Sequence, residues 1–306
     1  MAHERGHDHA RGMTDVRRLG VAIAIVATVL IVEVVGALLS GSLALLADAG
    51  HMFSDLTGLI VAVVAVRVSA RPATDRQTYG FRRAEVFGAL VNGAILLGVV
   101  IVVAVEAVQR LLEASAADVD ATPMLVVAII GALANIAALL VLRGGTEHSI
   151  NMRGAYLEVL GDLAGSVAVI IAAIVVLTTG FTAADPIASL FIAALIVPRA
   201  LSLLREVAGV LSESTPRGTD VALIRDHVLG TPGVVGVHDV HVWSITPGVN
   251  VFSAHVIAEE AVFTAGQTGT LLDRLGSCLT DHFDVEHSTF QLEPAEHARH
   301  EDHQHR

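Results

Sequence analysis

The stretch Leu43–Val66 is apolar enough to cross a lipid bilayer, yet it contains Asp48, His51 and Asp55. On a helix, residues four apart lie one turn above the other, so His51 and Asp55 share a face. A charged side chain at the centre of a bilayer costs about 2.5–3.5 kcal/mol on insertion scales, so such residues usually mark an ion path or a proton relay. The structural alternative is a helix cap or a hydrogen bond between helices.

A second apolar stretch, Asn151–Thr178, repeats this pattern with Glu158 and Asp162. A divalent ion that leaves water must regain donor atoms, and zinc takes four in a tetrahedron. Two helices that each offer residues i and i+4 supply four ligands without a break in either helix. We therefore expect the two pairs, which are His51, Asp55, Glu158 and Asp162, to form the halves of one transport site for a metal ion.

Composition places this site in a membrane protein. The chain has 306 residues, of which 53% are hydrophobic and 16% charged, and its mean hydropathy is +0.66. Such a chain is too apolar for an ordinary soluble protein. A span of the hydrocarbon core needs about 20 apolar residues, and such segments lie near residues 19–39, 43–66, 84–112, 123–142, 154–178 and 185–204. The net charge of −12 gives no reason to expect nucleic-acid binding, and a single cysteine excludes a disulfide framework within the chain.

The expected fold is a six-helix transmembrane bundle followed by a small cytoplasmic α+β domain. We expect a His-rich tail at 1–16, the transmembrane domain at 17–210, the α+β domain at 211–294 and a second His-rich tail at 295–306. Both tails are expected to be disordered, and the first either collects metal ions loosely or has no role. In the α+β domain, residue patterns predict helices near 219–230 and 267–282 and strands near 234–245, 250–258 and 287–293, in the order αββαβ.

Arginines predict the orientation in the membrane. They gather before the first span and in the loops that follow the second and fourth spans, whereas the opposite side has Arg110 beside several acidic residues. By the positive-inside rule, both termini lie in the cytoplasm. The polar N-terminus does not read as a cleavable signal peptide, and we expect a multi-pass protein of a bacterial inner membrane.

Metal binding requires deprotonated ligands, so metal ions and protons compete for one site. This competition suggests a carrier with alternating access that exchanges a metal ion for one or more protons. Glu33 lies in the middle of the first span. It either supports the site, for example as a proton relay, or packs against a neighbouring helix; the role of Asp48 stays open.

Five segments then carry a resemblance to a known family: SGSLALLADAGHMFSD, TYGFRRAEVFGALVNG, NMRGAYLEVLGDLAGSVAV, HDVHVW and FSAHV. Over roughly residues 17–293 the chain resembles the cation diffusion facilitator family, in its bacterial cobalt-zinc-cadmium efflux branch. The resemblance implies six membrane helices, a homodimer, a cytoplasmic domain of metallochaperone or ferredoxin-like type, and proton-driven export of zinc and similar ions. It also implies that His51, Asp55 and Asp162 are ligands of the transported ion.

Glu158 departs from the family pattern, which has histidine at this position in the zinc branch. One nitrogen and three oxygens make a harder site, which relaxes selectivity toward cobalt, cadmium, iron or manganese; we still expect zinc. His238, His255 and His287, with Glu293 as an additional candidate, match positions where relatives bind metal at the interface between cytoplasmic domains. Zn²⁺ is thus expected as the transported substrate, and no prosthetic group is expected. Zn²⁺ is also expected as a regulatory ligand of the cytoplasmic domain; the alternative is that these histidines only pack or form hydrogen bonds.

Two other classes of function are weighed against export. A membrane-embedded metal sensor without transport fits the soluble domain but leaves the paired acids in the bilayer unexplained. A membrane metalloprotease requires a HExxH helix, and an ATP-driven pump a GxxxxGK[ST] loop; the sequence contains neither. The expected partners are therefore divalent metal ions, protons and membrane lipid, and the family resemblance adds a second copy of the chain.

Overall fold

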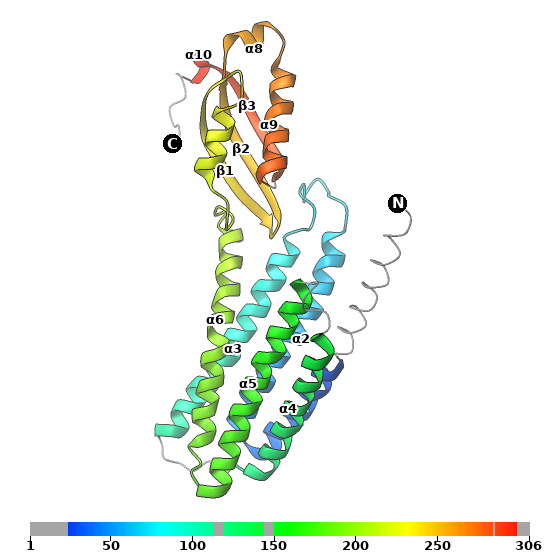
Figure 1. Ribbon diagram of the computed structural model, residues 1–306, viewed down its shortest axis with the longest axis vertical. Helices are drawn as coiled ribbons and strands as arrows, with labels where there is room; N and C mark the ends of the chain where they lie inside the picture. The colour runs from blue at the N-terminus through cyan, green and yellow to red at the C-terminus, as the bar shows by residue number, and fades with distance from the viewer. Residues whose placement is uncertain (1–23, 113–118, 144–149, 284, 299–306) are drawn as a thin grey trace, which may run out of the picture. The chain divides into compact units, whose positions relative to one another are not determined.

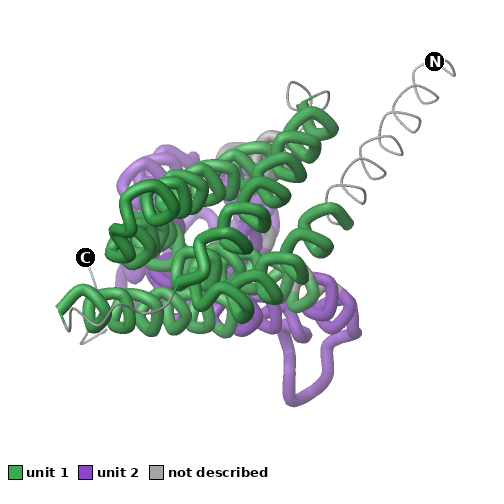
Figure 2. Tube along the Cα trace, turned by 90° about the horizontal axis from the view of Figure 1, so that it is seen from below, with its two compact units in different colours: residues 1–61, 91–203 green, residues 62–90, 204–306 purple. Residues whose placement is uncertain are grey.

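The computed structural model describes residues 24–112, 119–143, 150–283 and 285–298 (Figure 1). The chain divides into two compact units, drawn in different colours in Figure 2: residues 1–61 with 91–203, and residues 62–90 with 204–306. The predicted tail at 1–16 lies outside the described residues, and so does the predicted C-terminal tail after residue 298.

Long apolar helices dominate the chain up to residue 211. They are helix Ala24–Ser40, α2 (Leu43–Ser69), α3 (Ala84–Leu112), α4 (Ala121–Arg143), α5 (Ile150–Thr179) and α6 (Ala184–Leu211). Within the described residues, five of these helices are long and apolar enough to cross a membrane, and Ala24–Ser40 is shorter. The expected helical membrane domain is confirmed. α6 runs beyond the predicted end at residue 204, since hydropathy marks where a helix loses its apolar surface rather than where it ends.

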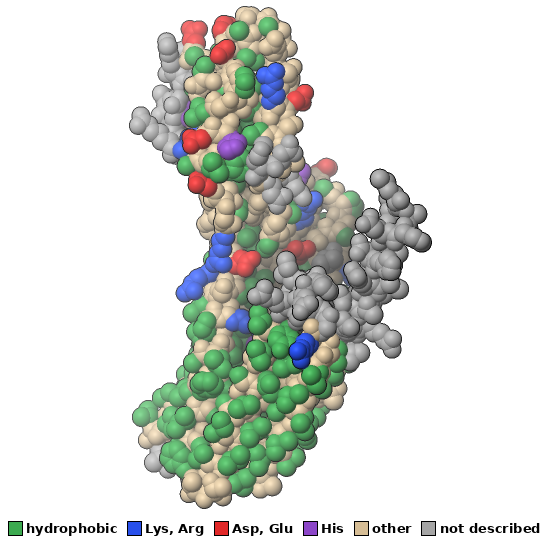
Figure 3. Space-filling view, viewed as in Figure 1, with side chains coloured by type: hydrophobic (Ala, Val, Ile, Leu, Met, Phe, Trp, Pro, Cys, Tyr) green, Lys and Arg blue, Asp and Glu red, His purple; other side chains and the backbone are tan. Residues whose placement is uncertain are grey.

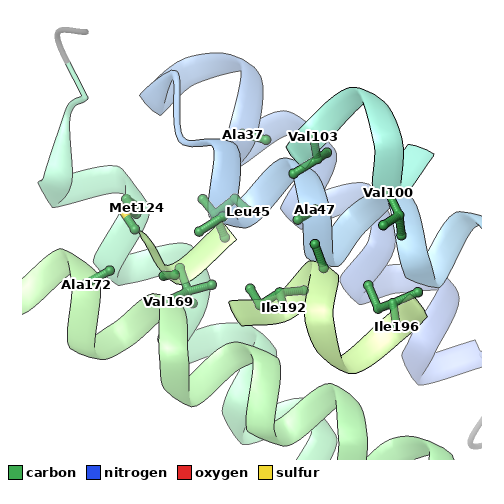
Figure 4. Packing of buried hydrophobic residues seen from close by; sticks show 14 of the residues in the cluster. Ala37, Leu45, Ala47, Val100, Val103, Met124, Val169, Ala172, Ile192 and Ile196 are labelled. Atoms are coloured by element: carbon green, nitrogen blue, oxygen red, sulfur yellow. The ribbon is translucent and has the colours of Figure 1, made fainter. Parts of the chain in front are cut away.

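Small and branched side chains fill the core of the first unit. Leu45 of α2, Met124 of α4, Val169 of α5 and Ile192 of α6 are buried in one cluster and lie close to one another in Figure 4. Several buried positions of this cluster are alanine, which allows helices to approach closely in a membrane bundle. Small side chains thus allow these helices to pack closely in the core of the first unit.

The outer faces of the same helices are apolar as well. Leu38, Val102 and Leu140 are each about two-thirds or more exposed, and hydrophobic side chains crowd the visible face of α4, α5 and α6 in Figure 3. A water-soluble protein rarely exposes so much contiguous apolar surface. These faces are suited to contact with lipid chains.

A buried carboxylate joins the beginning of α6 to the beginning of α2. The Asp185 side chain is fully buried and accepts hydrogen bonds from the Ser42 hydroxyl and from the backbone N–H groups of Leu43 (2.8 Å) and Ala44 (3.2 Å). The first N–H groups of a helix have no partner within the helix, so Asp185 caps α2 from a distant part of the chain. The Arg110 guanidinium lies 4.0 Å from the same carboxylate and partly balances its charge.

The second unit contains a three-stranded sheet packed against helices. Its elements after α6 are α7 (Val221–Leu229), β1 (Val234–Thr246), β2 (Val249–Ala258), α8 (Glu260–Thr264), α9 (Thr268–Phe283), β3 (Val285–Pro294) and α10 (Ala295–Ala298). β1 pairs antiparallel with β2, and β2 pairs parallel with β3. The core lies between the sheet and the helices and includes Ile224, Phe252 and Leu275.

The predicted αββαβ order is confirmed, with differences in detail. The short helices α8 and α10 were not predicted, because segments of four or five residues carry too little periodicity to be recognised. α10 covers the first four residues of the segment expected to be a disordered tail. β1 and β2 are also interrupted by a register shift between His238 and His241, where Asp239 has a φ of 48°.

Loss of the Asp185 carboxylate should destabilise the bundle. We expect Asp185→Ala to lower the free energy of unfolding by about 2 kcal/mol, because buried N–H donors of α2 lose their acceptor. Thermal unfolding of the purified protein in detergent measures the effect. Asp120→Ala is the matched control, since exposed Asp120 caps its own helix by a 3.1 Å bond to the Thr122 N–H; an equal loss in both variants would contradict the proposed role of Asp185.

Candidate metal centre

Three of the four residues expected at the transport site meet in the interior of the first unit. His51 and Asp55 lie one turn apart on α2, and Asp162 approaches them from α5. The His51 Nε2 lies 3.4 Å from Asp55 Oδ2 and 3.4 Å from Asp162 Oδ1. One ligand atom from each of the three lies within 4.8 Å of the other two. A single ion placed among them would contact donors from two helices.

Glu158 has a different environment. Its side chain is 35% exposed and makes an ion pair with Arg199 of α6. The same guanidinium lies 3.3 Å from Asp55 Oδ1, so Arg199 bridges the two carboxylates. The structure therefore brings His51, Asp55 and Asp162 together and directs Glu158 to a guanidinium at the side of this group.

The chemistry of the three-residue group suits a divalent cation. Asp162 Oδ1 and His51 Nδ1 are buried without a hydrogen-bond partner among the described residues. A buried carboxylate that lacks hydrogen bonds is costly unless a cation or a proton neutralises it. One imidazole nitrogen and two carboxylate oxygens are ligands that zinc and neighbouring transition-metal ions accept.

A cavity of about 170 Å³ lies beside this group. It is lined by residues of α2, α5 and α6, among them Asp48, His51, Glu158, Gly161 and Arg199. The lack of a side chain at Gly161 leaves open space, since a Cβ there would meet nothing within 4 Å. The cavity gives an ion or water a place next to the group.

The glycine at the next turn of α5 has another role. A Cβ at Gly165 would lie 2.8 Å from Asp48 Oδ1, closer than side chains approach one another. Asp48 is 2% exposed, so its carboxylate occupies the space that this glycine leaves. Sequence analysis left the role of Asp48 open, and the structure places it in the wall of the cavity.

Glu33 lies in a similar niche against α4. It is 1% exposed, and neither of its oxygens has a hydrogen-bond partner among the described residues. A Cβ at Gly131 would lie 2.7 Å from Glu33 Oε1 and 3.5 Å from the Ser166 hydroxyl. Ser166 in turn donates to the backbone oxygen of Asp162. Glu33 thus lies against α4, near Ser166, which is hydrogen-bonded to the backbone of Asp162.

A second cluster of possible ligands lies on the sheet of the other unit. His238 Nδ1 lies 2.9 Å from Asp239 Oδ2, and one ligand atom each from His238, Asp239 and His255 lies within 4.8 Å of the others. Glu293 is buried beneath them, 2.8 Å from His255 Nδ1 and 3.4 Å from His238 Nε2. Two imidazoles and two carboxylates therefore converge, as in many zinc sites.

His287, the third histidine expected here, lies elsewhere on the sheet. It pairs with Val251 in the β2–β3 register, whereas His255 pairs with Gln291, four residues farther along β3. Four residues of strand span about 13 Å. The exposed His287 ring instead packs edge-on against Tyr79 at a centroid distance of 6.2 Å. Within one chain, His287 does not join the other two histidines.

Two residues of these sites were missed in the sequence. Arg199 lies inside the predicted span 185–204 and was not proposed as a site residue, although a charged residue inside a span is itself a signal of function. Asp239 follows His238 directly, but an alternating strand would place the two side chains on opposite faces. The positive φ of Asp239, a conformation that aspartate tolerates better than most residues, returns its carboxylate to His238.

Comparison with known proteins gives consistent matches along the chain. Residues 19–212 match the family model described as cation efflux transmembrane domain, and residues 216–295 match the one described as cation efflux protein, cytoplasmic domain. The chain is 38% identical to the metal cation efflux system protein CzcD of Cupriavidus metallidurans, over 95% of this chain and 90% of that protein. It is 39% identical to the zinc transporter ZitB of Escherichia coli, over 96% of this chain and 93% of the relative.

Two further similarities concern an antiporter and a solved structure. The cadmium, cobalt and zinc/H(+)-K(+) antiporter of Bacillus subtilis is 35% identical, over 95% of this chain and 93% of that protein. The solved metal-bound C-terminal domain of the CzcD transporter is 35% identical, covers 24% of this chain and 99% of that domain, and has a TM-score of 0.22.

The two glycines of α5 generate a matched prediction. We expect Gly165→Ala to destabilise the protein by about 1–3 kcal/mol, because the new Cβ displaces the buried Asp48 carboxylate. Gly161→Ala, one turn earlier on the same helix, should cost less because open space surrounds its Cβ. Thermal unfolding in detergent compares the two. Equal stability of both variants would show that the close approach of Asp48 to α5 does not restrict the size of the side chain at position 165.

Proposed function

This chain belongs to the cation diffusion facilitator family of cation efflux transporters, and from that premise we propose that it exports Zn²⁺ from the cytoplasm in exchange for protons. The proposed transport site consists of His51 and Asp55 on α2 and Asp162 on α5. Glu158, one turn before Asp162 on α5, is the fourth proposed residue of the site. The proposed domains are 17–210 for transport and 211–294 for the cytoplasmic part. The protein is a transporter of its family and not an enzyme.

The observation that carries this proposal is the convergence of His51, Asp55 and Asp162 inside an apolar bundle. His51 and Asp55 lie 8 and 12 residues after the start of α2, which corresponds to about 12 and 18 Å along the helix. The hydrocarbon core of a bilayer is about 30 Å thick. The group thus lies near mid-depth, where a carrier with alternating access holds its cargo between the two sides.

The donor set supports zinc as the principal ion. It contains one imidazole nitrogen and two carboxylate oxygens, which also accept cobalt and cadmium, and relatives are named for zinc, cobalt and cadmium. Glu158 adds an oxygen at the side of the site. The alternative is therefore a carrier that prefers Mn²⁺ or Fe²⁺, which are harder ions.

Competition at these ligands supports the exchange for protons. An ion can bind only where His51, Asp55 and Asp162 have lost their protons, so loading releases protons and unloading takes them up. The antiporter of Bacillus subtilis is named for exchange with H⁺ and K⁺. A proton gradient across the membrane can thus drive the metal ion in the opposite direction.

We further propose an inner-membrane protein with both termini in the cytoplasm, as the arginine distribution indicates. The match of residues 216–295 to the cytoplasmic domain of cation efflux proteins supports a homodimer. The exposed apolar faces of the membrane helices provide the contact with lipid. A metal sensor without transport remains the second reading of the buried ligands, and the measurement of flux separates it from a carrier.

Flux into inverted membrane vesicles tests the proposal. Zinc should accumulate inside, the lumen should become more alkaline as protons leave, and an acidic lumen should accelerate uptake. We expect Asp55→Asn and Asp162→Asn to reduce uptake to the level of protein-free vesicles, because each removes a charged ligand from the site.

The control for this experiment is Asp75→Asn, which neutralises an exposed loop acid and should leave uptake unchanged. Uptake that ignores the pH gradient and leaves the lumenal pH constant would contradict proton exchange. Tight zinc binding in the purified protein without any flux would favour a sensor.

We propose that His238, Asp239 and His255, with Glu293 behind them, bind a regulatory zinc ion on the cytoplasmic domain. His287 would contribute to such a site only from a second protomer, since it lies farther along the sheet. The burial of Glu293 between two imidazoles supports this proposal, because the three groups can share one cation.

Zinc titration of the full-length protein tests the cytoplasmic site. His255→Ala should remove one zinc equivalent per chain while the protein still transports zinc at a saturating concentration. His241→Ala, which changes an exposed histidine on the neighbouring strand, should keep that equivalent. An unchanged stoichiometry in His255→Ala would contradict the site.

A further inference from the structure

Arg199 is a positively charged residue in direct contact with the proposed transport site. It belongs to α6, and its guanidinium makes ion pairs with Glu158 of α5 and with Asp55 of α2, the latter at 3.3 Å. Asp55 therefore has two neighbours: Arg199 at Oδ1 and His51 at Oδ2. A carboxylate of the metal-binding group is already paired with a cation that belongs to the protein.

Exposure of the side chains ranks these groups from accessible to buried. Arg199 is 46% exposed, Glu158 35%, Asp55 14% and Asp162 3%. Arg199 and Glu158 also line the cavity beside His51. Arg199 thus lies at the accessible end of the group and Asp162 at its buried end, so an ion that enters from the cavity meets the guanidinium before it reaches Asp162.

A guanidinium and a divalent ion compete at such a place. Arginine stays protonated in proteins, so it cannot relieve the competition by losing its charge. Inside an apolar bundle the repulsion between its charge and a bound divalent ion is much stronger than in water. Either the guanidinium moves away from Asp55 when the ion binds, or the ion binds more weakly because the guanidinium stays.

The chain has features that permit this movement. The side chain of Arg199 is long and nearly half exposed, so its charged head has room to extend away from Asp55. Pro198 precedes it inside α6. Because proline has no N–H, the helix lacks its usual hydrogen bond to the carbonyl group of Ala194, which weakens α6 directly before Arg199.

We propose that Arg199 is a tethered counter-cation of the transport site: it neutralises Asp55 and Glu158 while no metal ion is bound, gives way when the ion loads, and returns to promote its release. In this role Glu158 anchors the guanidinium and is not a required ligand of the ion. The inference rests on the proposed transport function of the His51, Asp55 and Asp162 group. Arg199 is a positioning residue whose competition lowers affinity for the cargo.

Zinc binding to the purified full-length protein is the first test. Asp162→Asn, measured alongside, reports binding by the rest of the chain and is subtracted. We expect Arg199→Gln to lower the Kd of the transport site by about tenfold, which corresponds to about 1.4 kcal/mol. Arg199→Lys keeps the charge and should stay close to wild type, whereas Arg205→Gln, farther along the same helix, is the control for charge removal away from the site.

Transport in proteoliposomes is the second test. If the guanidinium promotes release, Arg199→Gln should lower both KM and kcat for zinc, because the ion is held more tightly at each stage. A residue that only orients Asp55 as a ligand would give the opposite change in KM. If the positive charge promotes release, Arg199→Lys should keep kcat close to the wild-type value.

A paired variant covers the risk that an unpaired acid impairs folding of Arg199→Gln. Arg199→Gln/Glu158→Gln removes both members of the ion pair and leaves the three-residue group intact. We expect it also to bind zinc more tightly than wild type; unchanged or weaker binding in this paired variant overturns the proposal, whether or not Arg199→Gln folds. If Asp162→Asn binds as much zinc as wild type, the transport site itself is wrong, which is a separate result.

Discussion

A carboxylate buried in an apolar helix bundle needs a partner, because hydrocarbon offers neither water nor hydrogen bonds. This requirement connects the helices of the first unit. Asp185 meets it with donors at the beginning of α2, and Asp55 and Glu158 meet it with Arg199 of α6. Asp162 Oδ1 lies 3.4 Å from His51 Nε2 and has no hydrogen-bond partner among the residues that the structure describes. Among Asp55, Glu158 and Asp162, the least compensated carboxylate is therefore Asp162, which is also the most deeply buried of the three.

The membrane helices and the central pair of ligands could be predicted because both are local properties of the sequence. Contact with lipid requires long apolar runs, and a spacing of four residues fixes two side chains on one helix face. The contact between Arg199 and Glu158 spans 41 residues. Spacing does not reveal which helices become neighbours, so Glu158 was expected to face the metal ion rather than a guanidinium.

The sheet of the second unit shows the same limit on a smaller scale. Alternation predicted β1 and β2 correctly, but it could not predict the irregularity at Asp239, where one residue leaves the extended conformation. That single change adds a carboxylate to His238 and His255. The parallel register of β3 likewise depends on tertiary packing, and it separates His287 from the other histidines.

The cap formed by Asp185 has a mechanical consequence. Several hydrogen bonds at Asp185 hold α6 to α2, and 14 residues later Arg199 contacts α2 again through one ion pair, with Asp55. The helix between them is about 21 Å long. A tilt of α6 by about 5° about Asp185 would displace Arg199 by about 2 Å across the helix axis, given this length. A displacement of this size is enough to separate the guanidinium from the carboxylate of Asp55.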